Sequence, residues 1–558
     1  MANTHKQDLA KYIHERLGST DEMLHEWDTR KYDVNGRVVS KFWNNIQNAP
    51  AVVIVGDYDC DGICASHIMS TSIHSLYPNK RIKVRIPRRF SEGYGINMTI
   101  AEDIVQNMPA GTLVITVDNG IAAAEVLEYL QAHGFPVALT DHHELRKGCK
   151  IPNVDMVIDP SVKELDNPFE GNYWCGAAVA YKLCEPMINS DLAKDMSVFA
   201  GVATVADCMD LKEGNWGLVR HTIQAFRNGT APVSLCNLLK LMKQDPAYCM
   251  EDTIGFYLGP AFNAPGRLMD KGATEVLKYL NSPTDVACEN IVALNEQRKS
   301  IRDDEYQQVV VHLQHTGHIN DCPLWVSLPG LHEGIVGILA GKLSEEFKRP
   351  AIVLTNVEGK PGVLKGSARN YGDFNIFQYL SSIPAEDFLR MGGHKGAAGL
   401  SMTEEAFEKV RNAYPVDLKE IQESTIGTKI HMAIDKWEIP GISQVLDKFR
   451  PFGQGNEAPE FEVEIDMNKD HAKMLKDLHL CVEGPRLHPD IKGDFSVKYK
   501  LMHFNHVPND LKDPEHFKML GTIGESGFGG IVTPQFLAEE VMDIDEDKQE
   551  DSNMEERK

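Results

Sequence analysis

The chain has 558 residues. A single hydrophobic core does not extend over a chain of this length, so two to four domains are expected. Its composition, 42% hydrophobic and 25% charged, is typical of a globular protein. The sequence contains no uncharged apolar run long enough to cross a membrane and no apolar signal core near its first residue, so we expect a cytoplasmic protein without a membrane partner.

Charge is unevenly distributed along the chain. The formal net charge of -24 argues at first against a nucleic-acid partner. Residues 539–558 carry ten acids and three bases, and this acidic tail is expected to be disordered. Residues 80–89, KRIKVRIPRR, carry six bases and no acid, with apolar residues alternating at the strand period. Such a strand either forms a solvated sheet edge or lines a groove for phosphates, and the sequence leaves both open.

Four short β-branched runs in the first third of the chain predict a parallel sheet. They are residues 51–55, 113–117, 136–139 and 154–158, and helix-like segments separate them. This βαβα pattern is typical of a sheet covered by helices on both faces. Because ligands of open α/β sheets bind beyond the carboxyl ends of the strands, we expect the aspartates that follow the four runs to converge. These are Asp57, Asp118, Asp141 and Asp159.

The rest of the chain predicts a helical part, a second α/β unit and a β-rich end. Residues 175–300 are mostly helical in pattern, and the polar segment 284–312 is typical of a connecting helix. Strands at 324–328 and 351–355 flank a helix at 334–347. From about residue 425 onward, short alternating stretches predict a β-rich domain, a small barrel of the OB type.

Carboxylates and imidazoles gather in four motifs that follow apolar runs: DYDCDG, VDNG, DHH and VADCMD. Several carboxylates in one cleft repel one another unless cations neutralise them. Oxygen ligands with one or two imidazoles suit Mg²⁺ or Mn²⁺, whereas zinc sites hold more His or Cys, and the eleven cysteines form no CxxC pair. Two such ions about 3.5 to 4 Å apart activate a water and stabilise an in-line displacement at phosphorus. The motifs therefore predict phosphoester hydrolysis at a two-metal site.

Two structural alternatives exist for these motifs. The DxDxDG run could be a calcium loop, but such a loop needs a glutamate at its twelfth position, which here is Ile68. The DHH run by itself favours a helix cap that carries two surface imidazoles. Its combination with VDNG and VADCMD favours the metal site instead.

The ordered set of these four motifs resembles the DHH phosphoesterase superfamily. Further segments are similar to motifs of the RecJ family of single-strand-specific 5′ to 3′ DNA exonucleases: IPRRFSEGYG (86–95), NAPGR (263–267), GSARN (366–370), GGHKGAAG (392–399) and PFGQGNEAP (451–459). The resemblance runs from about residue 50 to residue 460. Asn370 and the shifted proline of GNEAP depart from the family's pattern, and neither change touches a proposed metal ligand.

The resemblance implies a set of metal ligands: Asp57, Asp59, Asp61, Asp118, His142, His143 and Asp207. Among the catalytic residues, Asp59 and Asp118 are expected as central ligands, His142 as a further ligand and His143 as the acid that protonates the leaving group. Asp141 is expected to orient a histidine rather than to bind metal. For Asp61 two roles stay open, as a ligand or as support for the ligands.

A 5′-end exonuclease also needs a pocket for a terminal phosphate. Arginine suits this task through its bidentate fork, and a hydroxyl or an amide in a glycine-rich turn completes such a cradle. The resemblance places substrate contacts on Arg89, Arg267, Ser367, Arg369 and His394. For Arg267 the alternative is a surface charge in a loop, and for GGHKGAAG it is close packing of two backbones.

The resemblance also implies an α/β fold of several parts. They are an N-terminal helical extension (1–45), a DHH phosphoesterase domain with a parallel sheet and the metal site (46–280), a connecting helix (281–315), a smaller α/β DHHA1-like substrate-binding domain (316–424), an OB-like nucleic-acid-binding domain (425–540) and the acidic tail (541–558).

We therefore expect a 5′ to 3′ exonuclease that releases mononucleotides processively from single-stranded DNA, in a cleft between two α/β domains, during repair, recombination or replication. Its expected partner is single-stranded DNA with a free 5′ end, a single-strand-binding protein or a helicase is a further candidate, and the chain is expected to be a monomer. One alternative is a phosphodiesterase for short oligonucleotides or cyclic dinucleotides, which would not need a third domain. Another is a non-catalytic DNA-binding scaffold, which would not need seven metal-binding side chains.

Overall fold

The computed structural model describes most of the chain in two compact units. The described residues are 9–15, 19–29, 34–145, 148–165, 169, 171, 173–419, 421, 431–470, 472–475, 479–484, 499–504, 511–528 and 531–544. One unit comprises residues 1–262, 273–288 and 430–558, and the other comprises residues 263–272 and 289–429. The expectation of disorder is wrong for the start of the acidic tail, because residues 539–542 belong to strand β17 (Ile531–Met542), and from residue 545 on the tail lies outside the described residues. Within those residues, no helix is both long enough and apolar enough to cross a membrane.

The four predicted runs form a parallel sheet in the first unit. The strands are β1 (Ala51–Val55), β3 (Leu113–Val117), β4 (Val137–Thr140) and β5 (Met156–Ile158), with β2 (Arg81–Arg85) beside β1. Their order is β2-β1-β3-β4-β5, and all four pairings are parallel. This is a doubly wound order, in which the winding direction reverses between β1 and β3 and ligands bind at that switch point.

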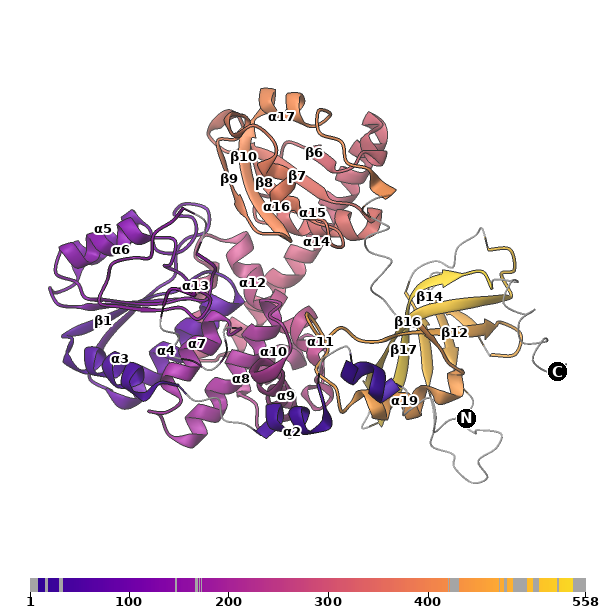
Figure 1. The fold of residues 1–558 in the computed structure, drawn as a ribbon, viewed down its shortest axis with the longest axis horizontal. Helices are drawn as coiled ribbons and strands as arrows, with labels where there is room; N and C mark the ends of the chain where they lie inside the picture. The colour runs from indigo at the N-terminus through magenta and orange to yellow at the C-terminus, as the bar shows by residue number, and fades with distance from the viewer. Residues whose placement is uncertain are drawn as a thin grey trace. The chain divides into compact units, whose positions relative to one another are not determined.

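Helices cover both faces of this sheet. Figure 1 shows α5 (Met98–Asn107) and α6 (Ala124–Ala132) on one face, with α3 (Gly36–Asn48) and α4 (Cys60–Leu76) on the other. Every residue of β1 and β3 is buried as a result, which explains why their sequences are apolar throughout rather than alternating. A shorter helix, α2 (Asp21–Thr29), precedes α3.

The basic strand β2 is an edge of the sheet. Lys83 Nζ lies 2.9 Å from Asp103 Oδ2, and Arg85 forms an ion pair with Glu92. Two of the three bases of the strand are therefore engaged by acids of the same unit. This favours the interpretation of KRIKVRIPRR as a sheet edge over its interpretation as a wall for phosphates.

A helical part follows the sheet, as expected. It contains α7 (Gly176–Cys184), α8 (Ser190–Ala206), α9 (Glu213–Arg227), α10 (Val233–Leu241), the short α11 (Glu251–Thr253), a π-helix (Ile254–Leu258), α12 (Gly259–Leu268) and α13 (Gly272–Asn281). The NAPGR segment lies inside α12, so the alternative that Arg267 is a surface charge in a loop is wrong. Pro265 concealed this helix, because proline is normally confined to the first turn of a helix.

The second unit holds the second α/β part. The connecting segment is a single 32-residue helix, α14 (Asp285–Thr316). The sheet has the order β6-β7-β8-β10-β9, with β6 parallel to β7 and the other pairs antiparallel. Its elements are β6 (Leu324–Ser327), α15 (Val336–Phe347), β7 (Ala351–Val357), β8 (Lys360–Arg369), α16 (Ile376–Ser381), β9 (Arg390–Gly393), β10 (Ala397–Thr403) and α17 (Glu404–Val410).

The end of the chain forms the β-rich, OB-like domain expected from the sequence. Its strands, in the order β11-β12-β16-β17-β15-β14-β13, are β11 (His431–Ala433), β12 (Glu460–Asp466), β13 (Ala472–Leu475), β14 (His479–Glu483), β15 (Lys500–His503), β16 (His516–Phe528) and β17 (Ile531–Met542). Helix α19 (Ile439–Leu446) packs into its core beside Phe461 and Phe517. The same core includes Trp27 and Trp216. This domain is therefore packed within the first unit, which the sequence did not predict.

Candidate metal centre

The ends of β1, β3 and β4 bring the predicted ligands together. Ligand atoms lie within 4.8 Å of one another in three overlapping groups: Asp57, Asp59 and Asp118; Asp61, His142 and Asp207; and Asp118, His142 and His143. All seven predicted ligands belong to at least one group, and we call them the metal cluster. Asp159 belongs to none of the three groups, and its Oδ1 accepts the backbone N–H of Ser161.

The backbone at Asp118 adopts an uncommon conformation next to a closely packed helix start. Asp118 has a φ of 61°, a left-handed conformation that costs a residue other than glycine about 1–2 kcal/mol. The first residue of α7 packs directly against it, since a Cβ added to Gly176 would lie 2.4 Å from Asp118 Cβ. Only glycine fits at position 176. Strain of this kind is concentrated at functional sites, where the surrounding structure must hold it.

Several polar atoms of the cluster are buried without a hydrogen-bond partner. They are both carboxylate oxygens of Asp57, Oδ1 of Asp118 and Nε2 of His142. His142 Nε2 lies 3.1 Å from Asp118 Oδ1, but the pair does not have the directional geometry of a hydrogen bond. A nitrogen and an oxygen that each offer a lone pair at this separation can both coordinate the same cation.

The electrostatics of the cluster also fit divalent cations. Burial raises the pKa of Asp57, Asp118 and Asp207, and the charges of neighbouring aspartates raise it further. Burial lowers the pKa of His142, which favours the neutral imidazole. Metal ligation requires ionised carboxylates and neutral imidazoles, so bound cations would stabilise the carboxylate form that burial disfavours.

Backbone amides hold two of the carboxylates. Asp61 accepts hydrogen bonds from the N–H groups of Gly176 and Ala177, both at 2.7 Å, at the positive end of α7. Asp59 is the N-cap of α4 and accepts the N–H of Gly62 at 3.0 Å. Asp61 therefore accepts more backbone hydrogen bonds than Asp59. Its carboxylate nevertheless lies within 4.8 Å of ligand atoms of His142 and Asp207.

Asp141 lies beside the cluster and contacts His143. Its Oδ1 is 2.7 Å from His143 Nδ1 and also accepts the N–H of His142, while its Oδ2 accepts the N–H of Ile121. Burial alone would lower the pKa of His143, but the hydrogen bond and charge of Asp141, with Asp207 and Asp59, raise it to about 9. Asp141 therefore lies where it could orient a histidine, as expected. The histidine whose ring it contacts is His143.

Tyr94 is a neighbour of the cluster that sequence reasoning did not single out. Its hydroxyl lies 3.3 Å from Nε2 of His143, and its ring meets that of Tyr58 edge-on at 6.1 Å between centroids. The guanidinium of Arg89 lies 4.8 Å from the Tyr58 ring centroid. Both tyrosines lie within the quoted motifs DYDCDG and IPRRFSEGYG, but nothing in their spacing shows that the two rings meet.

Asp207 is held at the end of a helix rather than a strand. It is the C-cap of α8, and its side chain is 33% exposed, against 2% for Asp61 and Asp118. A carboxylate at the negative end of a helix is unfavourable unless a cation lies close by. The position of Asp207 at the C-terminal end of α8 therefore also favours a cation close to its carboxylate.

Family models match the two α/β parts of the chain. The DHH family N-terminal domain matches residues 51–209, which contain the whole metal cluster, and the DHHA1 domain matches residues 323–415. These two segments of the chain are therefore similar to the DHH family N-terminal domain and to the DHHA1 domain. The resemblance to the RecJ family that the motifs indicated is also confirmed by the relatives described next.

Bacterial RecJ proteins resemble this chain over most of its length. The single-stranded-DNA-specific exonuclease RecJ of Bacillus subtilis is 30% identical over 77% of this chain and 55% of its own length. RecJ of Dickeya dadantii is 28% identical over 74% of each chain. The chain thus spans just over half of the first relative and about three quarters of the second. A crystal structure of Thermus thermophilus RecJ with Mn²⁺ shares the fold, with a TM-score of 0.69 at 21% identity over 92% of this chain and 72% of that chain.

Three predicted phosphate contacts lie around the start of α15 in the second unit, and we call them the arginine set. Arg369 Nη1 donates to Ser367 Oγ at 2.7 Å and to the carbonyl of Ala368 at 2.9 Å. Arg267 Nη1 donates to the carbonyl of Gly334 at 3.3 Å, just before α15 begins. Gly337, in the first turn of α15, leaves room beside Arg369, because a Cβ there would lie 3.2 Å from Nη2. Two guanidinium groups near the positive end of a helix suit an anion.

The other two predicted substrate contacts are placed differently. Arg89 lies in the DHH domain, in the unit of the metal cluster. His394 lies in the turn between β9 and β10 of the DHHA1 domain, where its Nδ1 accepts the N–H of Gly396 at 3.3 Å. The GGHKGAAG segment thus forms a β-hairpin turn and also packs closely, since a Cβ at Gly393 would lie 2.3 Å from the carbonyl oxygen of Ala397.

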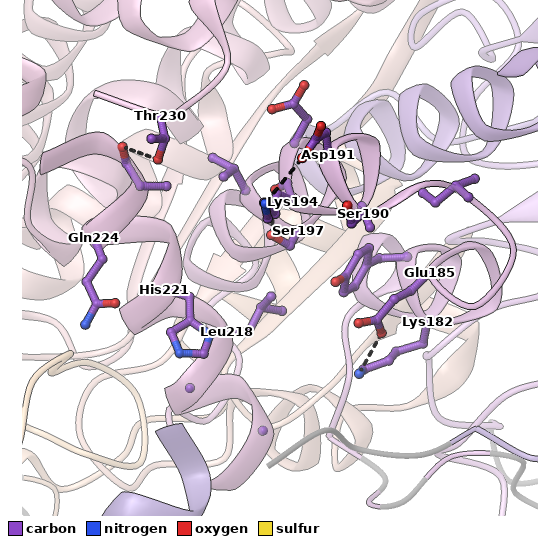
Figure 2. Close-up of a pocket in the computed structure, with 18 of the residues that line it drawn as sticks. Lys182, Glu185, Ser190, Asp191, Lys194, Ser197, Leu218, His221, Gln224 and Thr230 are labelled. Atoms are coloured by element: carbon purple, nitrogen blue, oxygen red, sulfur yellow. Dashed lines mark hydrogen bonds and ion pairs between the residues drawn. The ribbon is translucent and has the colours of Figure 1, made fainter. Parts of the chain in front are cut away.

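A large cavity of the first unit is separate from the metal cluster. It measures about 1010 Å³ and is lined by residues of α7, α8 and α9, none of which belongs to the cluster. Figure 2 shows Lys182 beside Glu185 and Lys194 beside Asp191, at 3.2 and 3.3 Å respectively. These opposite charges neutralise each other in pairs, so the cavity has no dominant charge that would select a ligand.

Proposed function

We propose that this chain is a metal-dependent exonuclease that enters single-stranded DNA at its 5′ end and releases mononucleotides. The observation that carries the proposal is the buried metal cluster at the switch point of the DHH domain, with polar atoms that lack a hydrogen-bond partner on Asp57, Asp118 and His142. The similarity to bacterial exonucleases named RecJ, over about three quarters of the chain, supports the choice of substrate.

Two Mg²⁺ or Mn²⁺ ions are the proposed cofactors. Asp57, Asp59 and Asp118 would hold one ion, and Asp61, His142 and Asp207 would hold the other. When bound, the ions supply Lewis acidity toward a water molecule and toward the phosphoryl oxygens. Crystal structures of Thermus thermophilus RecJ that share this fold contain Mn²⁺ in one case and Mg²⁺ in another.

The chain's own residues position the substrate and move the proton. The hydrogen bond and charge of Asp141 favour the protonated form of His143, so this imidazole can donate a proton to the departing 3′-oxygen. Asp141 orients that imidazole through the contact with Nδ1. The arginine set binds the terminal phosphate through the guanidinium forks, while Arg89 and His394 contact the strand elsewhere.

The finer assignments made from the sequence belong to the same proposal. They are the domain boundaries at 45, 280, 315, 424 and 540, a monomeric state, a cytoplasmic location, and a single-strand-binding protein or helicase as a partner. The DHHA1 match at 323–415 lies inside the expected range 316–424, which supports that boundary. The OB-like domain is proposed to extend the path of the single strand by stacking and electrostatic contacts.

Digestion of labelled DNA tests the proposal. A 5′-phosphorylated single strand, the same sequence as a duplex and a dinucleotide are each incubated with Mn²⁺ or Mg²⁺, and product lengths are followed with time. We expect mononucleotides from the single strand, released in order from the 5′ end, and little product from the duplex. Cleavage of the dinucleotide alone would support the short-oligonucleotide phosphodiesterase. DNA binding without cleavage under either metal would support the scaffold.

A further inference from the structure

The PFGQGNEAP motif forms a rigid turn whose position has a consequence for the metal cluster. Gly453 and Asn456 exchange backbone hydrogen bonds at 2.9 and 3.0 Å, which closes residues 452–456 into a turn. Asn456 is fully buried, and its Nδ2 donates to the carbonyls of Phe449 and Pro451 at 3.0 and 2.8 Å. These hydrogen bonds therefore restrict the turn to one conformation. We call it the 452–456 turn.

One side of the 452–456 turn rests on the segment that follows Asp207. The backbone N–H of Leu211 donates to the carbonyl of Gln454 at 2.8 Å. A Cβ at Gly453 would lie 2.8 Å from Leu211 Cδ1, and a Cβ at Gly455 would lie 3.0 Å from the carboxyl carbon of Asp210. Backbone, apolar and polar contacts thus join the turn to Asp210 and Leu211.

The other side of the turn is anchored to the helical part of the same unit. Glu251, the first residue of α11, accepts the backbone N–H of Phe452 at 3.2 Å and forms an ion pair with Arg450. Arg450 also donates to the carbonyl of Ile523 at 2.9 Å, in β16 of the OB-like domain. Because both sides are anchored, the turn cannot shift without moving either Glu251 or Leu211.

Asp207 lies three residues before the segment that the turn contacts. Among the three aspartates that face His142, Asp207 has the most exposed side chain. It is the C-cap of α8, and the next residue, Cys208, has a left-handed conformation with a φ of 52°. Met209 N–H donates to the carbonyl of Thr204 at 3.1 Å and Cys208 N–H to that of Val205 at 3.1 Å, which fixes only the helix end itself. Beyond Met209, the chain is held from two sides. Asn215 Nδ2 donates to the carbonyl of Asp210 at 3.1 Å, and the 452–456 turn contacts Asp210 and Leu211.

We propose that the 452–456 turn is a positioning element for Asp207, and through it for the cation that Asp207 shares with Asp61 and His142. The inference rests on the proposed function, because it takes the metal cluster as the site of that cation. Residues 453–456 thus affect the position of a metal ligand without contacting the cation themselves. The OB-like domain would then support the metal chemistry as well as any contact with DNA.

Mn²⁺ binding tests the inference with matched glycine variants. Gly455 and Gly229 have almost the same φ, 71° and 70°, but a Cβ at Gly229 meets nothing within 4 Å. Gly455→Val and Gly229→Val therefore introduce the same backbone strain, and only the first pushes on Asp210. Isothermal titration of each full-length variant with Mn²⁺ measures both binding steps, and Asp207→Asn shows the result of losing that ligand.

We expect Gly455→Val to weaken one of two Mn²⁺ binding steps by roughly tenfold or more, as supporting residues of metal sites do, and to leave the other step unchanged. Gly455→Ala should give a smaller effect on the same step, and it also serves if the valine variant does not fold. Unchanged affinities, or equal weakening in Gly455→Val and Gly229→Val, would overturn the inference. Absence of Mn²⁺ binding in the unaltered chain would instead contradict the proposed function.

Discussion

The metal cluster of the DHH domain and the arginine set of the second unit have opposite electrostatic character. In the cluster, polar atoms of Asp57 and Asp118 are buried without partners and the backbone is strained. In the arginine set, the guanidinium groups of Arg369 and Arg267 donate to protein oxygens. The cluster therefore contains buried polar atoms without partners, whereas the arginines already donate to neutral oxygens of the protein. Chemistry should depend on the cluster, and the choice of DNA end should depend on the arginine set.

The largest effect is expected from Asp118→Asn. Asparagine tolerates the left-handed backbone of position 118, so the change removes the charge while keeping the local conformation. We expect hydrolysis of a 5′-phosphorylated single strand to fall by roughly 10³-fold or more, since a charge aimed at the reacting group is lost. Single-turnover rates with saturating Mn²⁺ measure this effect. Asp103→Asn, which alters an aspartate paired with Lys83 on the same domain, is the control. Retained hydrolysis in Asp118→Asn would remove this residue from the site.

An intermediate effect is expected from Arg369→Lys. A lysine keeps the charge but loses the fork that donates to Ser367 and that we propose to bind phosphate oxygens. We expect the preference for a 5′-phosphate over a 5′-hydroxyl end to fall by about 10- to 100-fold, the equivalent of one charged hydrogen bond. Competition between the two substrates measures the preference, and Arg390→Lys, on an exposed part of β9, is the control. A changed Mn²⁺ affinity in Arg369→Lys, with the end preference intact, would contradict the division between the two regions.

The smallest effect concerns stability and its dependence on pH. Burial raises the pKa of Asp57, Asp118 and Asp207 in the cation-free chain, so the folded state binds protons more tightly than the unfolded state. The free energy of unfolding should therefore fall as pH rises above about 4, the ordinary range of carboxylates, and through the raised values. Mn²⁺ at one fixed concentration, tenfold above its dissociation constant at pH 6, should add about 1.4 kcal/mol per ion at pH 6 and more at pH 8, where it binds more tightly. Thermal unfolding with Mn²⁺ or EDTA at both pH values measures it. An equal gain at both pH values would argue against proton and metal competition at the cluster.

The sequence predicted the parts of the fold that depend on local patterns. Apolar runs such as 51–55 and 113–117 became buried parallel strands, because a sheet covered on both faces requires apolar residues at every position. The convergence of Asp57 and Asp118 followed from strand direction alone. The helix around Arg267 was missed, since Pro265 conceals it.

Long-range contacts could not be predicted from such patterns. No local signal joins Gly176 to Asp118, or places Tyr94 beside His143. The packing of the OB-like domain with Trp27 and Trp216 likewise depends on shape across hundreds of residues. The PFGQGNEAP motif was recognised as a motif, but its contact with Leu211 required the folded chain.

The hydrogen bond from Leu211 to Gln454 also has a consequence for synthesis of the chain. A ribosome adds about 5 to 20 residues per second, so the roughly 250 residues between Asp207 and the turn take on the order of 10 to 50 seconds. Throughout that interval the nascent DHH domain has all of its aspartates and histidines but lacks the 452–456 turn. If the turn positions Asp207, a nascent chain cannot complete its metal cluster before its OB-like domain has begun to emerge.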